Sequence, residues 1–270
     1  MSIVLITAVF AAVLAFVLGT ALGFFRQVFA VTQDPLAGQI REALPGANCG
    51  ACGYPGCDAY ASAVAKGEAG IAGCSVGGPA AAKRLAALVG GDAEVVPVVA
   101  VLACRGSKDR APEKGEYTGV RTCRGAKLSA GGTKLCAWGC LGFGDCAAVC
   151  KFGALSIGEN GLPRIDKTKC TGCKICTGEC PQGVLRAVPR DQEGSLVFCS
   201  NRNPVRAMVM KTCKAGCIKC GLCVKNCPRQ CIVMDNGIPL VDYGKCDSCG
   251  TCVSKCPTKV FNLLRDAQAV

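Results

Sequence analysis

The sequence predicts an α+β chain with one membrane-spanning helix at its N-terminus and several small domains folded around metal clusters. Three observations predict this class. The 270 residues include 25 cysteines and no histidine. A cysteine pattern of the form C-x2-C-x2-C-x3-C-P occurs twice in succession near the C-terminus. The chain also begins with a stretch, residues 3–25, that contains no charged side chain.

The doubled pattern between Cys217 and Cys256 is that of bacterial 4Fe–4S ferredoxins. In such runs the close triplet ligates three corners of one cube, and the fourth cysteine ligates the other cube. Zinc is the alternative, because C-x2-C pairs also form zinc ribbons, but those sites use separated pairs rather than triplets. The pattern therefore predicts two cubes. Their ligands are Cys217, Cys220, Cys223 and Cys256 for one, and Cys227, Cys246, Cys249 and Cys252 for the other.

The composition points to metal ligation in a reducing compartment rather than to a secreted disulfide scaffold. Without histidine the chain cannot use an imidazole base, a haem histidine or a Rieske site. The formal net charge of +12 is a weak argument for nucleic acid. An oxidised cube with four thiolates carries about −2, so five cubes leave roughly +2 and six leave about zero. The basic surplus is therefore expected to balance cluster charge, with no nucleic-acid partner.

Residues 3–25 are predicted to form a transmembrane helix about 34 Å long, enough for a bilayer core of roughly 30 Å. A signal peptide is disfavoured, because no basic segment precedes the apolar run and no small-x-small cleavage site follows. Arg26 and the other basic residues come after it, so the positive-inside rule places the C-terminal body in the cytoplasm. Gly19 and Gly23 form a small-x3-small pattern that can admit another membrane helix, with chance as the alternative.

A second cysteine group follows a short helix predicted from Pro35 to Leu44. Its members are Cys49, Cys52, Cys57 and Cys74, in a glycine-rich loop with the spacing C-x2-C-x4-C-x16-C. Spacing alone leaves zinc and 4Fe–4S open, and the ferredoxin pattern downstream favours iron. Beyond this group we expect a helix over residues 80–89, a strand over residues 95–102 that delivers Cys104, and a surface loop over residues 109–119.

The stretch from Cys136 to Cys180 repeats the C-terminal stretch with two differences. The cysteines recur 76 or 77 residues later, but Phe143 replaces the middle cysteine of a triplet and Lys151 replaces a proline. One cube is predicted on Cys150, Cys170, Cys173 and Cys176. The other has Cys140, Cys146 and Cys180, and we expect Cys136, one helical turn before Cys140, to complete it. A three-iron cluster on three cysteines is the alternative.

The remaining cysteines flank the two repeats. Cys123 and Cys199 are 76 residues apart, and with Cys104 and Cys213 they could hold a sixth cube, buried free thiols being the alternative. Cys231 is expected to be a core residue. The predicted domains are a transmembrane anchor (1–30), a Cys-rich 4Fe–4S module (31–92), a first ferredoxin-like domain with an N-terminal extension (93–190) and a second ferredoxin-like domain (191–270).

This order of parts, one transmembrane helix, a small Cys-rich iron–sulfur module and two tandem bacterial-type 2×(4Fe–4S) ferredoxin domains, resembles the B subunit of the Rnf complex. That complex is an ion-translocating ferredoxin:NAD oxidoreductase. The most specific pieces are CGACGYPGC at residues 49–57 and CLGFGDC at residues 140–146. The doubled ferredoxin region, with Phe143, resembles the longer members of the family, whereas Lys151 departs from the usual proline.

The resemblance implies a membrane-anchored electron-transfer subunit of a redox-driven translocase, single-pass in the inner membrane. It would accept electrons from reduced soluble ferredoxin, relay them along five or six 4Fe–4S clusters, and contact membrane and flavin-bearing subunits. The residues agree, since no strand–G-x-G-x-x-G–helix fingerprint and no base–nucleophile set is present, and no catalytic residue is expected. A polyferredoxin subunit of another membrane complex such as a hydrogenase, a zinc-binding nucleic-acid protein and a metal-held scaffold are the alternatives.

Overall fold

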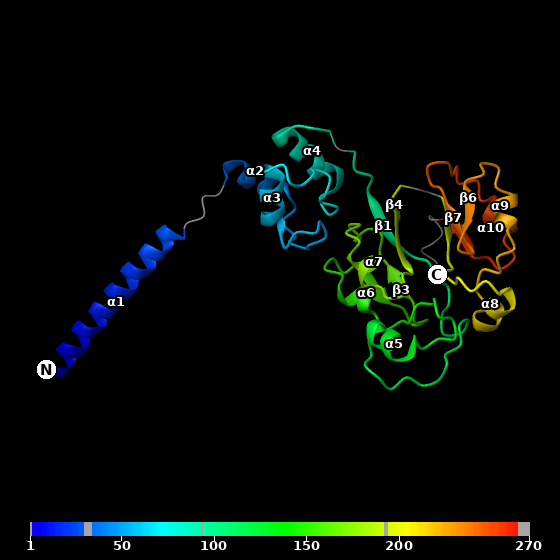
Figure 1. Cartoon of the computed structure of the whole chain (residues 1–270), viewed down its shortest axis with the longest axis horizontal. Helices are drawn as coiled ribbons and strands as arrows, with labels where there is room; N and C mark the ends of the chain where they lie inside the picture. The colour runs from blue at the N-terminus through cyan, green and yellow to red at the C-terminus, as the bar shows by residue number, and fades with distance from the viewer. Residues whose placement is uncertain (1, 30–33, 93, 192–193, 264–270) are drawn as a thin grey trace.

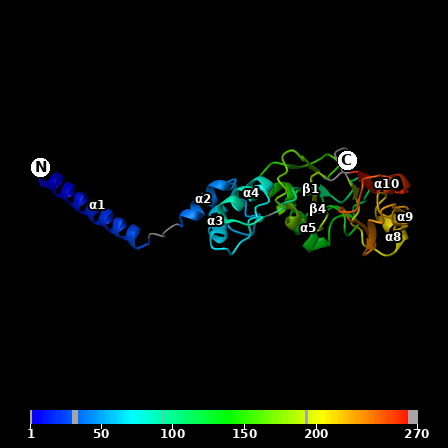
Figure 2. The same ribbon diagram turned by 90° about the horizontal axis from the view of Figure 1, so that it is seen from above.

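The computed structural model describes residues 2–29, 34–92, 94–191 and 194–263 of the chain. Its parts follow one another along the long axis, as Figures 1 and 2 both show. Helix α1 (Ser2–Val28) projects away from the rest, a three-helix module comes next, and two strand-containing halves lie at the far end.

Helix α1 has no packing partner within the described part of the chain. Its segment Ile3–Val28 is 26 residues long, none of it is buried, and length and composition suit a membrane crossing. At 1.5 Å per residue this segment is about 39 Å long. A Cβ added at Gly19 or Gly23 would meet nothing within 4 Å, so the face that carries the small residues is open.

The N-terminal module consists of α2 (Pro35–Ala43), α3 (Cys57–Ala65) and α4 (Gly78–Val89). Asp34 caps α2 by accepting a hydrogen bond from the backbone N of Leu36 at 2.9 Å, and proline follows at the first helical position. Helices α2 and α4 agree with the helices expected over 35–44 and 80–89, and α3 is additional. Their apolar faces meet in a core centred on Ile40, Tyr60 and Leu85.

The two halves have the same sequence of strands. The first contains β1 (Val98–Leu102), α5 (Cys123–Ala130), α6 (Asp145–Ala148), β2 (Leu155–Ile157), β3 (Pro163–Ile165), α7 (Ile175–Glu179) and β4 (Leu185–Pro189). The second contains β5 (Ser195–Val197), α8 (Arg206–Thr212), α9 (Leu222–Lys225), β6 (Ile232–Asp235), β7 (Ile238–Val241), α10 (Thr251–Lys255) and β8 (Phe261–Leu263). In each half the first strand pairs antiparallel with the last, and the two middle strands form a hairpin.

Strand register fixes which residues of the two halves correspond. Ala100 lies opposite Ala187 in the first half, and Ser195 lies opposite Leu263 in the second. Since residues 187 and 263 are 76 apart, the internal repeat equates Ala100 with Ser195. The first strands therefore correspond at an offset of 95 residues, because the first half carries a longer connection after its first strand.

The parts of the body are in contact. Near the ends of β1 and β5, Arg105 donates to the carbonyl of Lys259 at 2.5 Å, and Ser200 Oγ donates to the carbonyl of Ala103 at 3.0 Å. Lys151, which stands where a proline was expected, donates from Nζ to the carbonyl of Asn48 at 3.2 Å. This last bond joins the N-terminal module to the first half.

Candidate metal centres

Four hollows in the structure are each lined by four cysteines. Set 1 is Cys49, Cys52, Cys57 and Cys74; set 2 is Cys123, Cys140, Cys146 and Cys180; set 3 is Cys150, Cys170, Cys173 and Cys176; set 4 is Cys217, Cys220, Cys223 and Cys256. The hollows have similar volumes of about 340, 360, 390 and 300 Å³ in the same order. Four thiols around one hollow are the donor set of a 4Fe–4S cube.

Set 1 is held together by polar contacts across its loop. Asn48 Oδ1 accepts a hydrogen bond from the backbone N of Cys57 at 2.8 Å, which fixes the start of α3. Tyr60, buried on the inner face of α3, donates its hydroxyl to the carbonyl of Gly70 at 2.6 Å and accepts from the backbone N of Gly73 at 3.1 Å. These bonds bring the segment before Cys74 back to the loop that carries the other three thiols.

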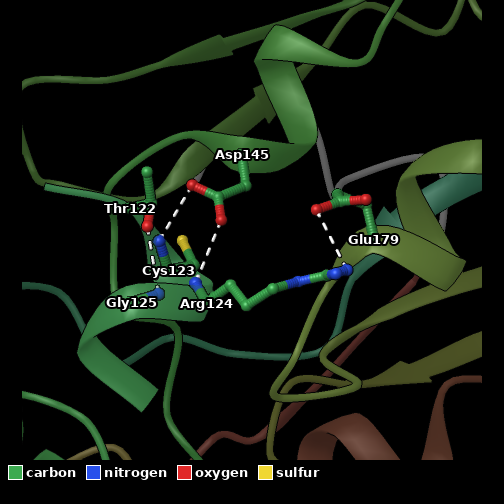
Figure 3. Close-up of polar contacts among 6 residues, drawn as sticks. All are labelled: Thr122, Cys123, Arg124, Gly125, Asp145 and Glu179. Carbon is green, nitrogen blue, oxygen red and sulfur yellow. Dashed lines mark hydrogen bonds and ion pairs between the residues drawn. The ribbon is translucent and has the colours of Figure 1, made fainter. Parts of the chain in front are cut away.

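Set 2 contains Cys123, which lies at the first position of α5. Figure 3 shows how that helix end is fixed: Asp145 accepts from the backbone N of Cys123 at 2.8 Å and of Arg124 at 3.0 Å. Asp145 precedes Cys146, so the carboxylate ties the thiol of a distant helix to the triplet. Thr122 caps the same helix by accepting from the backbone N of Gly125 at 3.0 Å.

The position of Cys123 corrects the expectation that Cys136 completes this set. Phe143 occupies the place of the missing cysteine and packs its ring against Tyr117, with ring centroids 5.7 Å apart. The fourth thiol comes instead from α5, outside the motif. Cys136 does not line the set 2 hollow.

Set 3 and its repeat counterpart, set 5 (Cys227, Cys246, Cys249 and Cys252), use loops of the same shape. Gly172 and Lys174 have φ of +69° and +63°, and Ser248 and Gly250, their counterparts, have +59° and +72°. A Cβ at Gly172 would collide with the carbonyl oxygen of Val98 on β1, so that loop packs tightly on the strand. The repeated geometry places Cys246, Cys249 and Cys252 as Cys170, Cys173 and Cys176 are placed.

Set 6 consists of two cysteines from each half: Cys104, Cys136, Cys199 and Cys213. A Cβ added at Gly106 would lie 3.5 Å from Cys104 Sγ and 3.7 Å from Cys213 Sγ. Burial, and the nearby thiols of the other three members, raise the pKa of Cys213 to about 11. The possible sixth cube was expected to use Cys123. The structure brings Cys136 to this place instead.

The two halves contribute to set 6 in the same way. The backbone N of Cys140 donates to Cys104 Sγ at 3.4 Å, and that of Cys217 donates to Cys199 Sγ at 3.3 Å. Cys104 and Cys199 follow corresponding strands, so they are repeat partners, whereas Cys123 has another role. The pairing of Cys123 with Cys199 at 76 residues in the sequence is therefore a coincidence of spacing.

Buried cations lie beside set 6. Lys134 is 2% exposed, and its ammonium donates to the carbonyl of Gly106 at 2.6 Å. No carboxylate lies within ion-pair distance of Lys134 in the part of the chain that the structure describes. Burial lowers the pKa of Arg186, whose guanidinium also interacts with the thiol of Cys199. A buried charge needs a counter-charge, and an anionic cube on set 6 would supply one.

The thiol geometry suits cubes better than single ions. All 25 cysteines are free thiols. Among the described residues no three Cys, Asp or Glu side chains converge closely enough for one metal ion, and zinc would require sulfur atoms about 2.3 Å from a common centre. Burial raises the pKa of Cys146 to about 11 and that of Cys176 to about 12. These thiols are therefore protonated at neutral pH, and metal binding must displace their protons.

Cys231 is buried in the core of the second half, where it was expected from the sequence. It also contacts set 5, because its Sγ lies 3.4 Å from Cys227 Sγ. Nothing in the cysteine spacing signalled this contact. The chain thus has 24 thiols in six sets of four, and one further thiol against the fifth.

Family models match three parts of the chain. A putative Fe–S cluster model matches residues 44–76, a 4Fe–4S binding domain matches residues 163–186, and a 4Fe–4S dicluster domain matches residues 216–260. The first contains set 1, and the other two contain the triplets of sets 3, 4 and 5. These matches support the predicted fold class of an apolar helix, an iron–sulfur module and two ferredoxin domains.

Curated relatives match most of the chain. The B subunit of a Na(+)-translocating ferredoxin:NAD(+) oxidoreductase complex, from Acetobacterium woodii, is 42% identical over 87% of this chain and 70% of its own length. The B subunit of a proton-translocating ferredoxin:NAD(+) oxidoreductase complex, from Clostridium ljungdahlii, is 40% identical over 91% and 87%. The B subunit of an ion-translocating oxidoreductase complex, from Methanosarcina acetivorans, is 38% identical over 86% and 88%. The chain belongs to this family, the B subunits of the ion-translocating oxidoreductase complexes called Rnf.

Proposed function

We propose that this chain accepts single electrons from a reduced soluble ferredoxin and passes them through six 4Fe–4S clusters toward flavin-bearing subunits of its Rnf complex. Each bound cluster supplies a centre that is reduced and reoxidised by one electron. The chain's own contribution is to hold the clusters, to keep water from them and to set their potentials. Reduction of NAD and movement of Na⁺ or H⁺ fall to the other subunits, and the chain has no bond-making site.

Each set of four thiols is assigned one cube, so the proposed ligands are the 24 cysteines of sets 1 to 6. The assignment keeps the crossed ligation of bacterial ferredoxins, because Cys150 joins the Cys170 triplet and Cys227 joins the Cys246 triplet. It also keeps the domain boundaries expected from the sequence, at residues 30, 92 and 190. Set 6 then lies between the two ferredoxin domains.

The observation that carries the proposal is the arrangement of thiols: four hollows lined by four cysteines each, and two further groups of four. A relay needs several centres in one folded unit, and this arrangement supports such a relay. A scaffold held by zinc would need sulfur atoms converging on single points.

The membrane part of the proposal is a single-pass anchor with the cluster-bearing body in the cytoplasm. The apolar surface of α1 and the placement of Arg26 at its C-terminal end support this orientation. Proteolysis tests it: the body should be cut in inverted vesicles and protected in intact right-side-out cells. Cleavage in intact cells would contradict the orientation.

Metal analysis tests the cluster count. The full chain, purified without oxygen in detergent, should contain about 24 irons and as many sulfides, four of each per cube. Reduced ferredoxin should bleach its visible absorbance in a rapid-mixing experiment. A colourless preparation richer in zinc than in iron would refute the cluster assignment, and a brown preparation that ferredoxin does not reduce would refute the donor.

Paired substitutions test the ligand sets that the structure corrected. Cys123→Ala with Cys140→Ala removes two thiols of one set and should cost about four irons. Cys136→Ala with Cys140→Ala touches sets 6 and 2 and should cost about eight. If the two pairs gave the reverse result, Cys136 would be the ligand of the set with Cys140. If Cys123→Ala left the iron content unchanged, set 2 would hold a three-iron cluster.

A further inference from the structure

Sets 3 and 5 occupy the same place in the two halves, yet their thiols have different polar neighbours. Three side chains with a hydrogen to donate lie against set 5. Ser195 Oγ is 2.8 Å from Cys252 Sγ, Cys231 Sγ is 3.4 Å from Cys227 Sγ, and Thr251 Oγ1 is 3.4 Å from Cys249 Sγ. Three of the four thiols of set 5 therefore have a side-chain partner.

The repeat places an apolar residue at each corresponding position around set 3. Strand register equates Ser195 with Ala100. Ile175 precedes Cys176 as Thr251 precedes Cys252. Ala154 and Cys231 correspond because each accepts, through its carbonyl, a 2.8 Å hydrogen bond from the aspartate that follows the hairpin.

All three apolar counterparts line the set 3 hollow. They are Ala100, Ala154 and Ile175. The difference between the two sets is thus confined to the side chains that touch the sulfur atoms, on backbones that match. Set 3 does receive a hydrogen bond from the backbone, from the N of Ala100 to Cys170 Sγ at 3.5 Å.

A cysteine that ligates iron is a thiolate and can only accept a hydrogen bond. The hydroxyls of Ser195 and Thr251 and the thiol of Cys231 must then donate to it. Reduction adds one negative charge to the cube, so donors at sulfur favour the reduced form and raise the potential. Solvent acts in the same direction, because Cys249 is exposed whereas its counterpart Cys173 is partly covered.

We propose that Ser195, Cys231 and Thr251 tune the cube on set 5 to a more positive potential than the cube on set 3. This inference rests on the proposed function, since it assumes a cube on each set. When one electron leaves the set 3 cube and enters the set 5 cube, the first is oxidised by one electron and the second reduced by one. The electron shared by these two sites therefore resides at the C-terminal one.

A redox titration of the full chain, followed by EPR, tests the proposal. The variant S195A/C231A/T251I gives set 5 the apolar surroundings of set 3. One component with the amplitude of a single cube should move to lower potential, with about a tenfold lower ratio of reduced to oxidised form at a fixed applied potential. For a one-electron couple this is about 59 mV. Iron content should stay at the unmodified level.

Two further variants make the test specific. Ala100→Ser with Ile175→Thr introduces donors at set 3, and should move one component to higher potential. Cys231→Ser, which keeps a donor at that position, should titrate closer to the unmodified chain than Cys231→Ala.

A titration curve unchanged in S195A/C231A/T251I would overturn the proposal. Loss of about four irons in Cys231→Ala would also overturn it, because Cys231 would then be a ligand and not a donor. Failure of the proposed function looks different: the unmodified chain would itself lack the EPR signals of reduced 4Fe–4S clusters.

Discussion

The carboxylate of Asp145 is the contact whose removal gives the sharpest test of how set 2 is assembled. It accepts two hydrogen bonds from the first two amides of α5, those of Cys123 and Arg124. A hydrogen bond to a charged group contributes about 1.5–3 kcal/mol, and a negative charge at a helix N-terminus adds about 0.3–1 kcal/mol. Asp145→Asn keeps one carbonyl acceptor and loses the charge, so local stability should fall by about 2 kcal/mol.

Hydrogen exchange is the measurement that reads this loss directly. A local destabilisation of about 2 kcal/mol raises the open fraction about 30-fold, so exchange in a peptide covering residues 122–130 should accelerate by that factor. Glu179→Gln is the matched control. It removes only the exposed ion pair with Arg124, 3.3 Å long, and such pairs contribute about 0–1 kcal/mol.

The reasoning fails if Asp145→Asn leaves exchange in that peptide within about threefold of the unmodified chain, a change of under about 1 kcal/mol. It also fails if Glu179→Gln accelerates exchange as much as Asp145→Asn does. Either result would mean that packing, and not the carboxylate, holds Cys123 at its place in set 2.

Three other predictions follow from local geometry. Gly172→Ala should destabilise the first half by several kcal/mol and lower the iron content, because its Cβ would strike β1, whereas Gly183→Ala, also at positive φ but with nothing within 4 Å, should cost only about 1 kcal/mol; denaturant titration and iron analysis compare them. Burial raises the pKa of Tyr60 above its usual 10, so the stability from its protonated hydroxyl should be intact below pH 10 and lost as the pH rises further, a dependence that Tyr60→Phe should flatten in melting curves at the cost of about 1–3 kcal/mol at neutral pH. Lys151→Met should loosen the N-terminal module from the first half and speed limited proteolysis of residues 90–94 a few-fold, since the bond to Asn48 is exposed and contributes about 1 kcal/mol; unchanged cleavage would show that the bond holds nothing.

The sequence predicted the parts of the fold that depend on local spacing. The triplets, the repeat and the crossover cysteines led to sets 1, 3, 4 and 5 as the structure groups them, and the helices at 35–43 and 78–89 agree with their expected positions within two residues. These features follow from residues close together in the chain, where spacing determines geometry.

The ligand of set 2 and the membership of set 6 could not be obtained in that way. Cys123 reaches set 2 from a helix in a connection that the second half does not share, so no repeat distance points to it. The longer connection also shifts the first strands to an offset of 95 residues. A signal for set 6 was present, because Cys104 and Cys199 each end a buried apolar run, but the regular offset of 76 obscured it.

The composition of set 6 has a consequence for how the molecule would respond to its surroundings. Each half supplies two of its thiols, so a cube there would join the two halves of the polypeptide through inorganic atoms. Iron starvation or an oxidative burst that dissolved this cube would remove the junction and leave only a few hydrogen bonds, such as that from Arg105, to keep the halves aligned. Cellular iron supply would then govern the cohesion of the subunit as well as its redox capacity.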